Sequence, residues 1–189
     1  MSRIIKTEVF KFDELSDAAK DKARGWYREV SAGDEYYAEC TIEESKGKIG
    51  KALGFDISDI YYSGFCCQGD GASFKGTWRA ADVNAKALQQ YAPADKVLAQ
   101  IRKRMRVFAR AHKNNSANIT TSGRYSHEYS MTIEADQGSD TLAEIARDFA
   151  RWIYRQLEAE YMYQYYGEGC DETIRANEYT FTAEGRRFG

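Results

Sequence analysis

Two runs of strand-forming residues on either side of a glycine-rich turn constrain the fold of this chain more than any other feature. The runs cover about Ile57–Phe65 and Ala72–Trp78. Between them lies Gln68-Gly69-Asp70-Gly71, and Asp and Gly tolerate the positive φ angles of tight hairpin turns. The segment therefore predicts a β-hairpin, with its two strands paired antiparallel.

The rest of the chain alternates between strands and blocks of helix. A first strand is predicted over Ile4–Phe12 and a last one over Glu178–Thr182. A second hairpin is predicted to join Asn118–Thr121 to Tyr125–Ala135. In its second strand, Tyr129, Met131 and Ile133 are expected to share one face. Apolar residues at helical spacing predict six helices. The first follows an N-cap at Ser16, and the fifth runs from a Thr141/Glu144 capping box to about Tyr165. The other four are predicted over Tyr36–Leu53, Ala81–Ala92, Asp95–His112 and Asp171–Ala176. This order predicts an α+β fold: an antiparallel sheet built from two hairpins plus terminal strands, packed with three or four helices.

Size and composition predict one domain. The chain has 189 residues and a single proline, Pro93, which is expected to close one helix and to open the next. Hydrophobic residues make up 43% and charged residues 30%, which is enough for a sizeable core. We therefore expect a single α+β domain over residues 1–189. The net charge of −2 argues against a general polycation. The absence of an apolar leader or a membrane-length segment predicts a location in the cytoplasm.

The cysteines and histidines show no familiar ligand spacing. Cys66 and Cys67 are expected to point to opposite faces of a strand, and the four cysteines lack C-x-x-C spacing. His112 and His127 lie on different predicted elements, and His112 continues an apolar stripe as a packed helix-end residue. The sequence therefore predicts no metal, no cofactor and no catalytic residue. An enzymatic site around the loop with Gln68 and Asp70 stays a minor alternative to a plain turn.

One predicted helix carries a basic stripe. Its cations recur at helical spacing, largely away from the apolar stripe of the same helix; they are Arg102, Lys103, Arg106, Arg110 and Lys113, with Arg104 beside them. Such a stripe is typical of the solvated outer face of an amphipathic helix. The alternative is an electrostatic contact surface for nucleic acid or for an acidic protein patch.

A second candidate surface combines tyrosines with acidic residues. Its members are Glu158, Glu160, Tyr161, Tyr163, Tyr165, Tyr166 and Glu168. Tyrosine is enriched at protein interfaces, so the cluster suggests a partner-binding patch, with a helix end resting on the sheet as the alternative. For an interface we expect at least two exposed rings among Tyr163, Tyr165 and Tyr166. Replacing Tyr165 and Tyr166 by Ala is then expected to leave folding largely intact.

Three segments carry a resemblance to a known family. They are Phe12–Lys20 (FDELSDAAK) followed by Trp26-Tyr27-Arg28, Ser63–Phe74 (SGFCCQGDGASF), and Asn177–Phe188 (NEYTFTAEGRRF). Together they resemble a family of small proteins encoded by bacteriophages and prophages, some of which are loosely labelled antitoxin-like. That family brings no catalytic residue, and a bulky residue such as Trp is associated with the position of Cys66.

The resemblance implies a phage-derived binding protein that inhibits or modulates a host protein, such as a CRISPR-type defence complex. The basic helix leaves a second hypothesis open, in which the chain binds nucleic acid directly, and the label of the resembling family implies an antitoxin-like regulator as a further alternative. For the phage-derived protein, the expected location is the cytoplasm of the host cell. The partner and the oligomeric state are not predicted by the sequence, and no membrane partner is expected.

Overall fold

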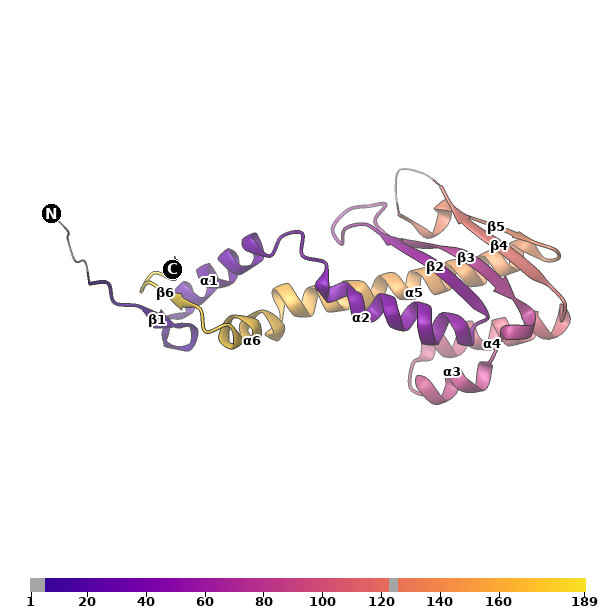
Figure 1. The fold of residues 1–189 in the computed structure, drawn as a ribbon, viewed down its shortest axis with the longest axis horizontal. Coiled ribbons are helices and arrows are strands. Elements are labelled where there is room, and N and C mark those ends of the chain that lie inside the picture. The colour runs from indigo at the N-terminus through magenta and orange to yellow at the C-terminus, as the bar shows by residue number, and fades with distance from the viewer. Residues whose placement is uncertain (1–5, 123–125) are drawn as a thin grey trace. The chain divides into compact units, whose positions relative to one another are not determined.

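The computed structural model describes residues 6–122 and 126–189 and confirms the predicted α+β fold class (Figure 1). The described part contains six α-helices and two antiparallel sheets. The chain divides into two compact units. Unit 1 comprises Met1–Tyr37 and Ala159–Gly189, and unit 2 comprises Ala38–Glu158. The expectation of one domain stays a prediction, and each unit is described by itself.

Unit 2 is built on the two predicted hairpins. Its sheet has the strand order β2 (Phe55–Tyr62), β3 (Ala72–Arg79), β4 (Ser116–Thr121) and β5 (Met131–Ala135). Phe55 pairs with Trp78, and Ile119 pairs with both Gly76 and Ile133. Buried residues alternate with exposed ones along β2, β4 and β5, so one face of the sheet packs against helices and the other is polar.

The second hairpin differs from its prediction at its turn. Residues 123–125, which include the expected Gly123 and the start of the expected second strand, lie outside the described residues. The strand β5 begins at Met131, because Glu128–Ser130 form a 3₁₀ turn before it. Tyr129 therefore does not share the face of Met131 and Ile133: its side chain is 64% exposed, whereas the other two are buried.

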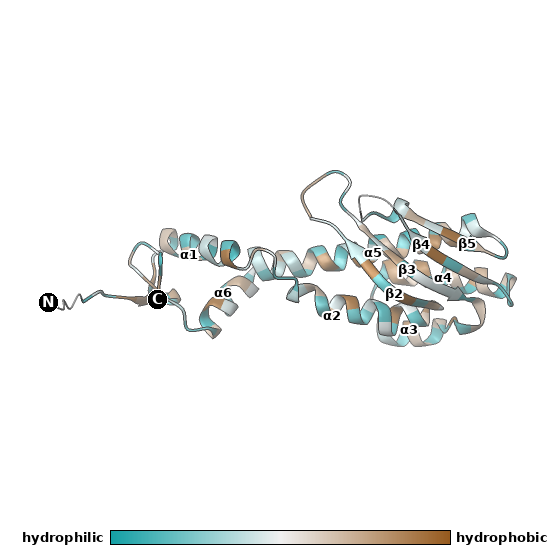
Figure 2. Ribbon diagram, turned by 45° about the horizontal axis from the view of Figure 1, so that its top comes forward, coloured by the Kyte–Doolittle hydropathy of each residue, from teal (hydrophilic) through white to brown (hydrophobic). Residues whose placement is uncertain are grey.

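Four helices accompany this sheet. They are α2 (Tyr36–Glu44), which continues through a π-helical stretch at Ser45–Gly50, α3 (Ala85–Tyr91), α4 (Lys96–Ala111) and α5 (Ser139–Tyr166), whose residues from Ala159 onward belong to unit 1. Figure 2 shows apolar residues recurring along the strands and the helices of this unit. None of the helices in the described ranges combines the length and apolar composition needed to cross a membrane.

Aromatic contacts join the sheet to α5 and α4. Phe149 on α5 stacks on Phe55 at a centroid distance of 5.8 Å and meets Phe74 edge-on at the same distance. Trp78 packs on Phe108 of α4 at 5.4 Å, and its Nε1 donates a hydrogen bond of 3.0 Å to the Leu53 carbonyl. The two large helices are therefore fixed on the apolar face by rings that the alternation of the strands places there.

The structure confirms the predicted start of α1 (Asp17–Val30) but not those of α4 at Pro93 and of α5 at Thr141. Ser16 and Asp95 cap α1 and α4, and their side chains accept from the Ala19 and Leu98 amides. Pro93 lies in the turn between α3 and α4 and does not open α4. The Thr141/Glu144 capping box is wrong, because α5 already begins at Ser139, directly after Gly138 with φ +66.

Unit 1 holds the terminal strands, which pair with each other and do not extend the hairpin sheet. Its order is β1 (Phe10–Lys11), β6 (Thr180–Phe181) and β7 (Arg187–Phe188). The first predicted strand is thus reduced to two residues, because Phe12–Glu14 turn into a 3₁₀ helix, while Ile4 and Ile5 lie outside the described residues. The strand β7 was missed, since two residues are too short to produce an alternation signal.

The core of unit 1 lies between α1, α6 (Glu168–Ala176) and this small sheet. Its buried members are Phe12, Leu15, Ala19, Ala23, Tyr27, Tyr165, Cys170, Ile174 and Phe181. Beside it, Arg24 donates from Nε and Nη2 to the two carboxylate oxygens of Asp171, at 2.7 and 2.8 Å. This two-point contact joins α1 to α6, and it lowers the pKa of Asp171 because Arg24 stabilises the charged form.

Replacing Phe149 by Ala should lower the free energy of unfolding by about 3–5 kcal/mol, since it removes a fully buried ring from the centre of unit 2. Chemical denaturation monitored by circular dichroism measures this change. The matched control is Val107→Ala on α4, which is 60% exposed and should change stability by no more than about 0.5 kcal/mol. Equal effects of the two substitutions would contradict the packing described above.

Replacing Asp171 by Asn should lower the free energy of unfolding at neutral pH by about 1–3 kcal/mol. It should also reduce the loss of stability that the wild-type protein shows as the pH falls. The lowered pKa of Asp171 means that its contribution is fully present above about pH 4, the ordinary range of the carboxyl, and is lost as the pH falls through the lowered value. Melting temperatures measured between neutral and strongly acidic pH should therefore converge for wild type and variant at the acidic end. Glu29→Gln, an exposed change on the same helix α1, should leave the curve unchanged. Parallel curves for wild type and D171N would refute the role of the pair.

Candidate functional site: a basic groove along α4

The amphipathic pattern of α4 determines which of its side chains reach solvent. Its apolar stripe is buried, and consists of Leu98, Ile101, Met105, Phe108 and Ala109. Since an α-helix has 3.6 residues per turn, Arg102, Arg106 and Arg110 fall on a different line of the helix surface. Arg106 and Arg110 are exposed and Arg102 is half-buried. The sequence therefore places a row of cations beside a firmly packed stripe.

This row forms one wall of a groove of about 1020 Å³. The opposite side comes from α3 and from the 3₁₀ turn Ala80–Asp82, and small residues such as Ala80, Ala99 and Ala109 contribute to the lining. Its cations are Lys86, Arg102, Lys103, Arg106, Arg110 and Lys113. The structure thus brings the five predicted basic residues together and adds Lys86, which the sequence analysis missed because it lies on another helix.

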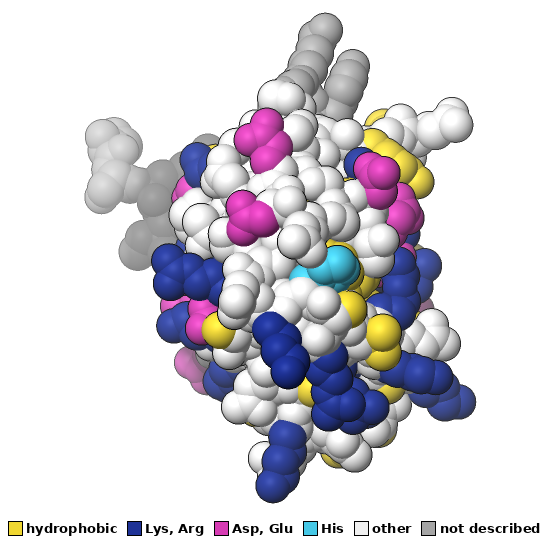
Figure 3. All heavy atoms as spheres, turned by 90° about the vertical axis from the view of Figure 1, so that its right-hand side faces the viewer, with side chains coloured by type: hydrophobic (Ala, Val, Ile, Leu, Met, Phe, Trp, Pro, Cys, Tyr) yellow, Lys and Arg dark blue, Asp and Glu magenta, His cyan; other side chains and the backbone are white. Residues whose placement is uncertain are grey.

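Among the described residues, no acidic side chain neutralises the charges of the groove. The part of the lining that the structure describes contains neither Asp nor Glu. Within residues 6–122 and 126–189, none of the six cations takes part in an ion pair, although Arg104 on the same helix pairs with Asp148. Figure 3 shows Lys and Arg side chains gathered over the lower half of this end of unit 2. The groove therefore offers uncompensated positive charge to an anion from solvent.

The tyrosines of the expected patch differ in their exposure to solvent, and Tyr165 is buried. Tyr165 is only 6% exposed, and its hydroxyl donates a 2.9 Å hydrogen bond to the Asp34 carbonyl. Burial raises the pKa of Tyr165 to about 12. Its ring packs near Tyr27 and Tyr37, so it belongs to the core of unit 1 and is not available to a partner. The prediction that the Tyr165/Tyr166 double substitution would leave folding intact is therefore wrong for Tyr165.

Two rings of the patch do reach solvent, as predicted. Tyr163 is 47% and Tyr166 57% exposed. The Tyr163 hydroxyl donates to the Glu172 carboxylate at 2.8 Å, and the Arg28 guanidinium lies 5.1 Å from the Tyr166 ring centroid. Glu160 and Glu168 are exposed on the same unit, whereas Glu158 belongs to unit 2. Tyr161 packs against Tyr37 at 5.5 Å and is half-buried. The structure thus reduces the patch to Tyr163, Tyr166 and nearby carboxylates.

The loop between β2 and β3 is longer than a tight turn and covers Ser63–Gly71. Gln68 is exposed at its tip, and Gly69 has φ +107. Asp70 fixes the loop, because its Oδ2 accepts the backbone N–H groups of Cys66 and Cys67 at 3.0 and 2.7 Å. Cys66 and Cys67 are therefore not strand residues, and the expectation that they point to opposite faces is wrong.

His112 is a packed helix-end residue, as predicted. It ends α4, its ring centroid lies 4.7 Å from that of Phe108, and its Nδ1 is 3.0 Å from the Gln137 side-chain oxygen. His127 lies in the other hairpin connection and stacks on Tyr129 at 5.5 Å. Both rings therefore have a structural explanation.

Comparison with known proteins identifies a family but no activity. A family model described as a domain of unknown function, DUF8835, matches residues 37–166, which is more than half of the chain. The chain therefore belongs to the DUF8835 family. No curated protein and no solved structure matched it.

Replacing Tyr165 by Ala should lower the free energy of unfolding by about 3–5 kcal/mol, because a buried ring and its hydroxyl contact are lost. The neighbouring substitution Tyr166→Ala should cost no more than about 1 kcal/mol, since it removes only an exposed ring and its contact with Arg28. Thermal melting of the two single variants distinguishes them. Similar melting temperatures would mean that Tyr165 is not a core residue.

Proposed function

We propose that this member of the DUF8835 family binds nucleic acid through the basic groove of α4, contacting the phosphate backbone of a duplex. The observation that carries the proposal is a set of six cations in one groove, none of which has an acidic partner among the described residues. Phosphate contacts by Lys and Arg supply most of the affinity of sequence-independent nucleic-acid binding. The overall charge of −2 means that this attraction is local to the groove.

The extent of the groove favours a polymer over a small anion. Arg102 and Arg110 are about 12 Å apart along the helix axis, given a rise of about 1.5 Å per residue. Lys86 lies on the other wall of the groove, and Lys113 follows the end of α4. Charges distributed in this way match a series of phosphates better than a single phosphate, which a compact cluster of donors would hold.

The lining also favours backbone contacts over base stacking. Within residues 6–122 and 126–189, no aromatic residue lines the groove, whereas single-strand binding proteins stack bases on aromatic rings. The polar groups between the cations include the amides of Asn84, Gln89 and Gln100, which can hydrogen-bond to phosphate and sugar. We therefore infer a duplex held by its backbone, with little sequence preference.

The interpretation as a phage-derived inhibitor of a host protein rests on the resemblance of three sequence segments and stays a prediction. Tyr163 and Tyr166 are the exposed rings that such a partner would contact. An acidic protein surface is the other occupant that the charge of the groove allows. A direct measurement of binding to nucleic acid separates these occupants.

Binding of the intact protein to a double-stranded DNA fragment of arbitrary sequence should fall steeply with salt. If all six cations contact phosphates, the slope of log K against log salt is about −5, so affinity should drop about a thousandfold between about 50 and 200 mM salt. Arg106→Glu combined with Arg110→Glu should abolish detectable binding and reduce stability little, since both side chains are exposed. Fluorescence anisotropy measures the affinity.

The matched control is Lys51→Glu combined with Lys96→Glu. These two lysines are exposed in unit 2, Lys96 on α4 itself, and neither lines the groove. The control carries the same change of net charge and should retain most of the affinity. Absence of DNA binding at low salt, or equal losses in both double variants, would overturn the proposal.

A further inference from the structure

We propose that Cys66, Cys67 and Asp70 form a binding site for a thiophilic divalent cation such as Zn²⁺, with two thiolates and one carboxylate as ligands. One potential ligand atom from each residue lies within 4.8 Å of the other two. Thiolate sulfur and carboxylate oxygen are both established zinc ligands. This site lies on the Ser63–Gly71 loop and is independent of the basic groove.

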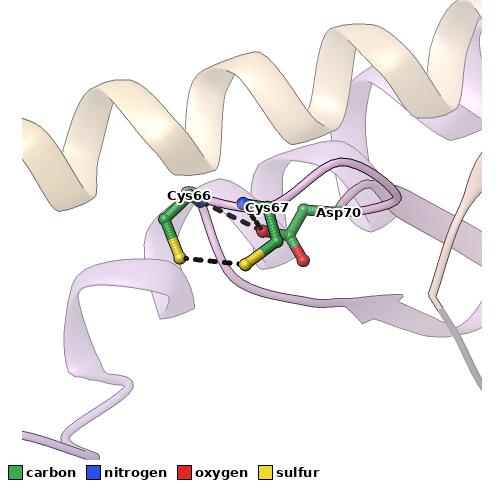
Figure 4. A group of neighbouring side chains, drawn as sticks. All are labelled: Cys66, Cys67 and Asp70. Carbon is green, nitrogen blue, oxygen red and sulfur yellow. Dashed lines mark hydrogen bonds between the residues drawn. The ribbon is translucent and has the colours of Figure 1, made fainter.

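The two sulfur atoms have nearly the separation that a shared ion requires. Figure 4 shows both Sγ atoms on the same side of the loop, and they are 3.5 Å apart. Zn–S bonds of about 2.3 Å in a tetrahedron place two sulfur ligands about 3.8 Å apart. A disulfide needs about 2.05 Å, so the observed separation is much closer to that of a metal site.

Asp70 supplies the third ligand and also shapes the loop. Its Oδ2 accepts the N–H groups of both cysteines, and a carboxylate has about four lone-pair sites, so capacity for a metal remains. These two backbone hydrogen bonds lower the pKa of Asp70 and keep it ionised. The ligand set is therefore anionic before any thiol loses its proton.

The loop is held in place by contacts with the rest of unit 2. The Ser63 amide donates to the Gly71 carbonyl at 3.1 Å, which closes the base of the loop. Tyr154 on α5 donates its hydroxyl to the Gly64 carbonyl at 2.9 Å, and its ring lies 5.4 Å from that of Phe65. The cysteines themselves are exposed, so an ion can enter from solvent. The protein offers three ligands, and water completes a tetrahedral site.

Metal binding at this site must release protons. Each thiol that coordinates the cation gives its proton to solvent, and its sulfur forms the bond to the metal with its lone pair, without change of oxidation state. Affinity is therefore expected to rise with pH across the range in which the thiols are otherwise protonated.

The test uses the reduced, chelator-treated protein in two separate titrations. Binding of Zn²⁺ alone is measured by calorimetry. Binding of Cd²⁺ alone is measured by the ultraviolet charge-transfer absorption of cadmium thiolates. We expect one ion per chain. Cys66→Ser and Cys67→Ser should each weaken binding at least tenfold and reduce the cadmium absorption, and Asp70→Asn should weaken binding while leaving the absorption at saturation in place.

The matched control is Cys40→Ser, which removes another exposed cysteine of unit 2 and should change neither measurement. Circular dichroism of each variant verifies that it is folded. The proposal is overturned if wild type binds no Zn²⁺, if C66S and C67S bind as wild type does, or if thiol counting finds Cys66 and Cys67 joined as a disulfide in the protein as isolated. Because the titration uses no nucleic acid, its failure is distinguishable from failure of the proposed function.

Discussion

The basic groove depends on how Trp78 is buried. This ring is fully enclosed, donates its N–H to the Leu53 carbonyl and packs on Phe108 of α4. It therefore joins the end of the helical segment before β2, the strand β3 and the helix α4 at one point. Because Phe108 is held there, the opposite line of α4, with Arg106 and Arg110, must face away from the sheet. The position of the charges follows from the packing of apolar rings.

Periodicity in the sequence located the two hairpins and the helix α4 of unit 2, but not the starts of β5 and α5. The alternation in β2 and the stripe Leu98–Phe108 of α4 arise from one-sided burial, which produces a pattern among residues close together in the chain. The same stripe predicted the five basic residues of α4. Lys86 was not predictable in this way, because its place in the groove depends on how α3 packs beside α4, a contact between elements that no local pattern encodes.

The wrong predictions share a physical reason. Tyr165 and Tyr166 are adjacent and chemically identical, yet one is buried and the other exposed, since packing against Tyr27 and Tyr37 selects one side of the helix. Cys66 and Cys67 were predicted to lie in a strand, but their backbone N–H groups donate to the Asp70 carboxylate, and this segment forms a loop. The terminal strands were assigned to the hairpin sheet, although Phe10 pairs with Phe181. Each outcome depends on partners that local propensity does not specify.

Arg104 and Arg106 differ in their electrostatic surroundings. They are two positions apart on α4, but Arg104 pairs with Asp148 of α5, whereas Arg106 lines a groove in which the described residues include no carboxylate. A face that serves only solubility is expected to mix both signs of charge, because neighbouring like charges repel. The chain has 29 acidic residues and 27 basic ones, so its number of carboxylates would allow acidic side chains in this groove. Among the described residues, no carboxylate lines this groove, so its positive charge stays concentrated, which is the electrostatic basis of the proposed binding to a polyanion.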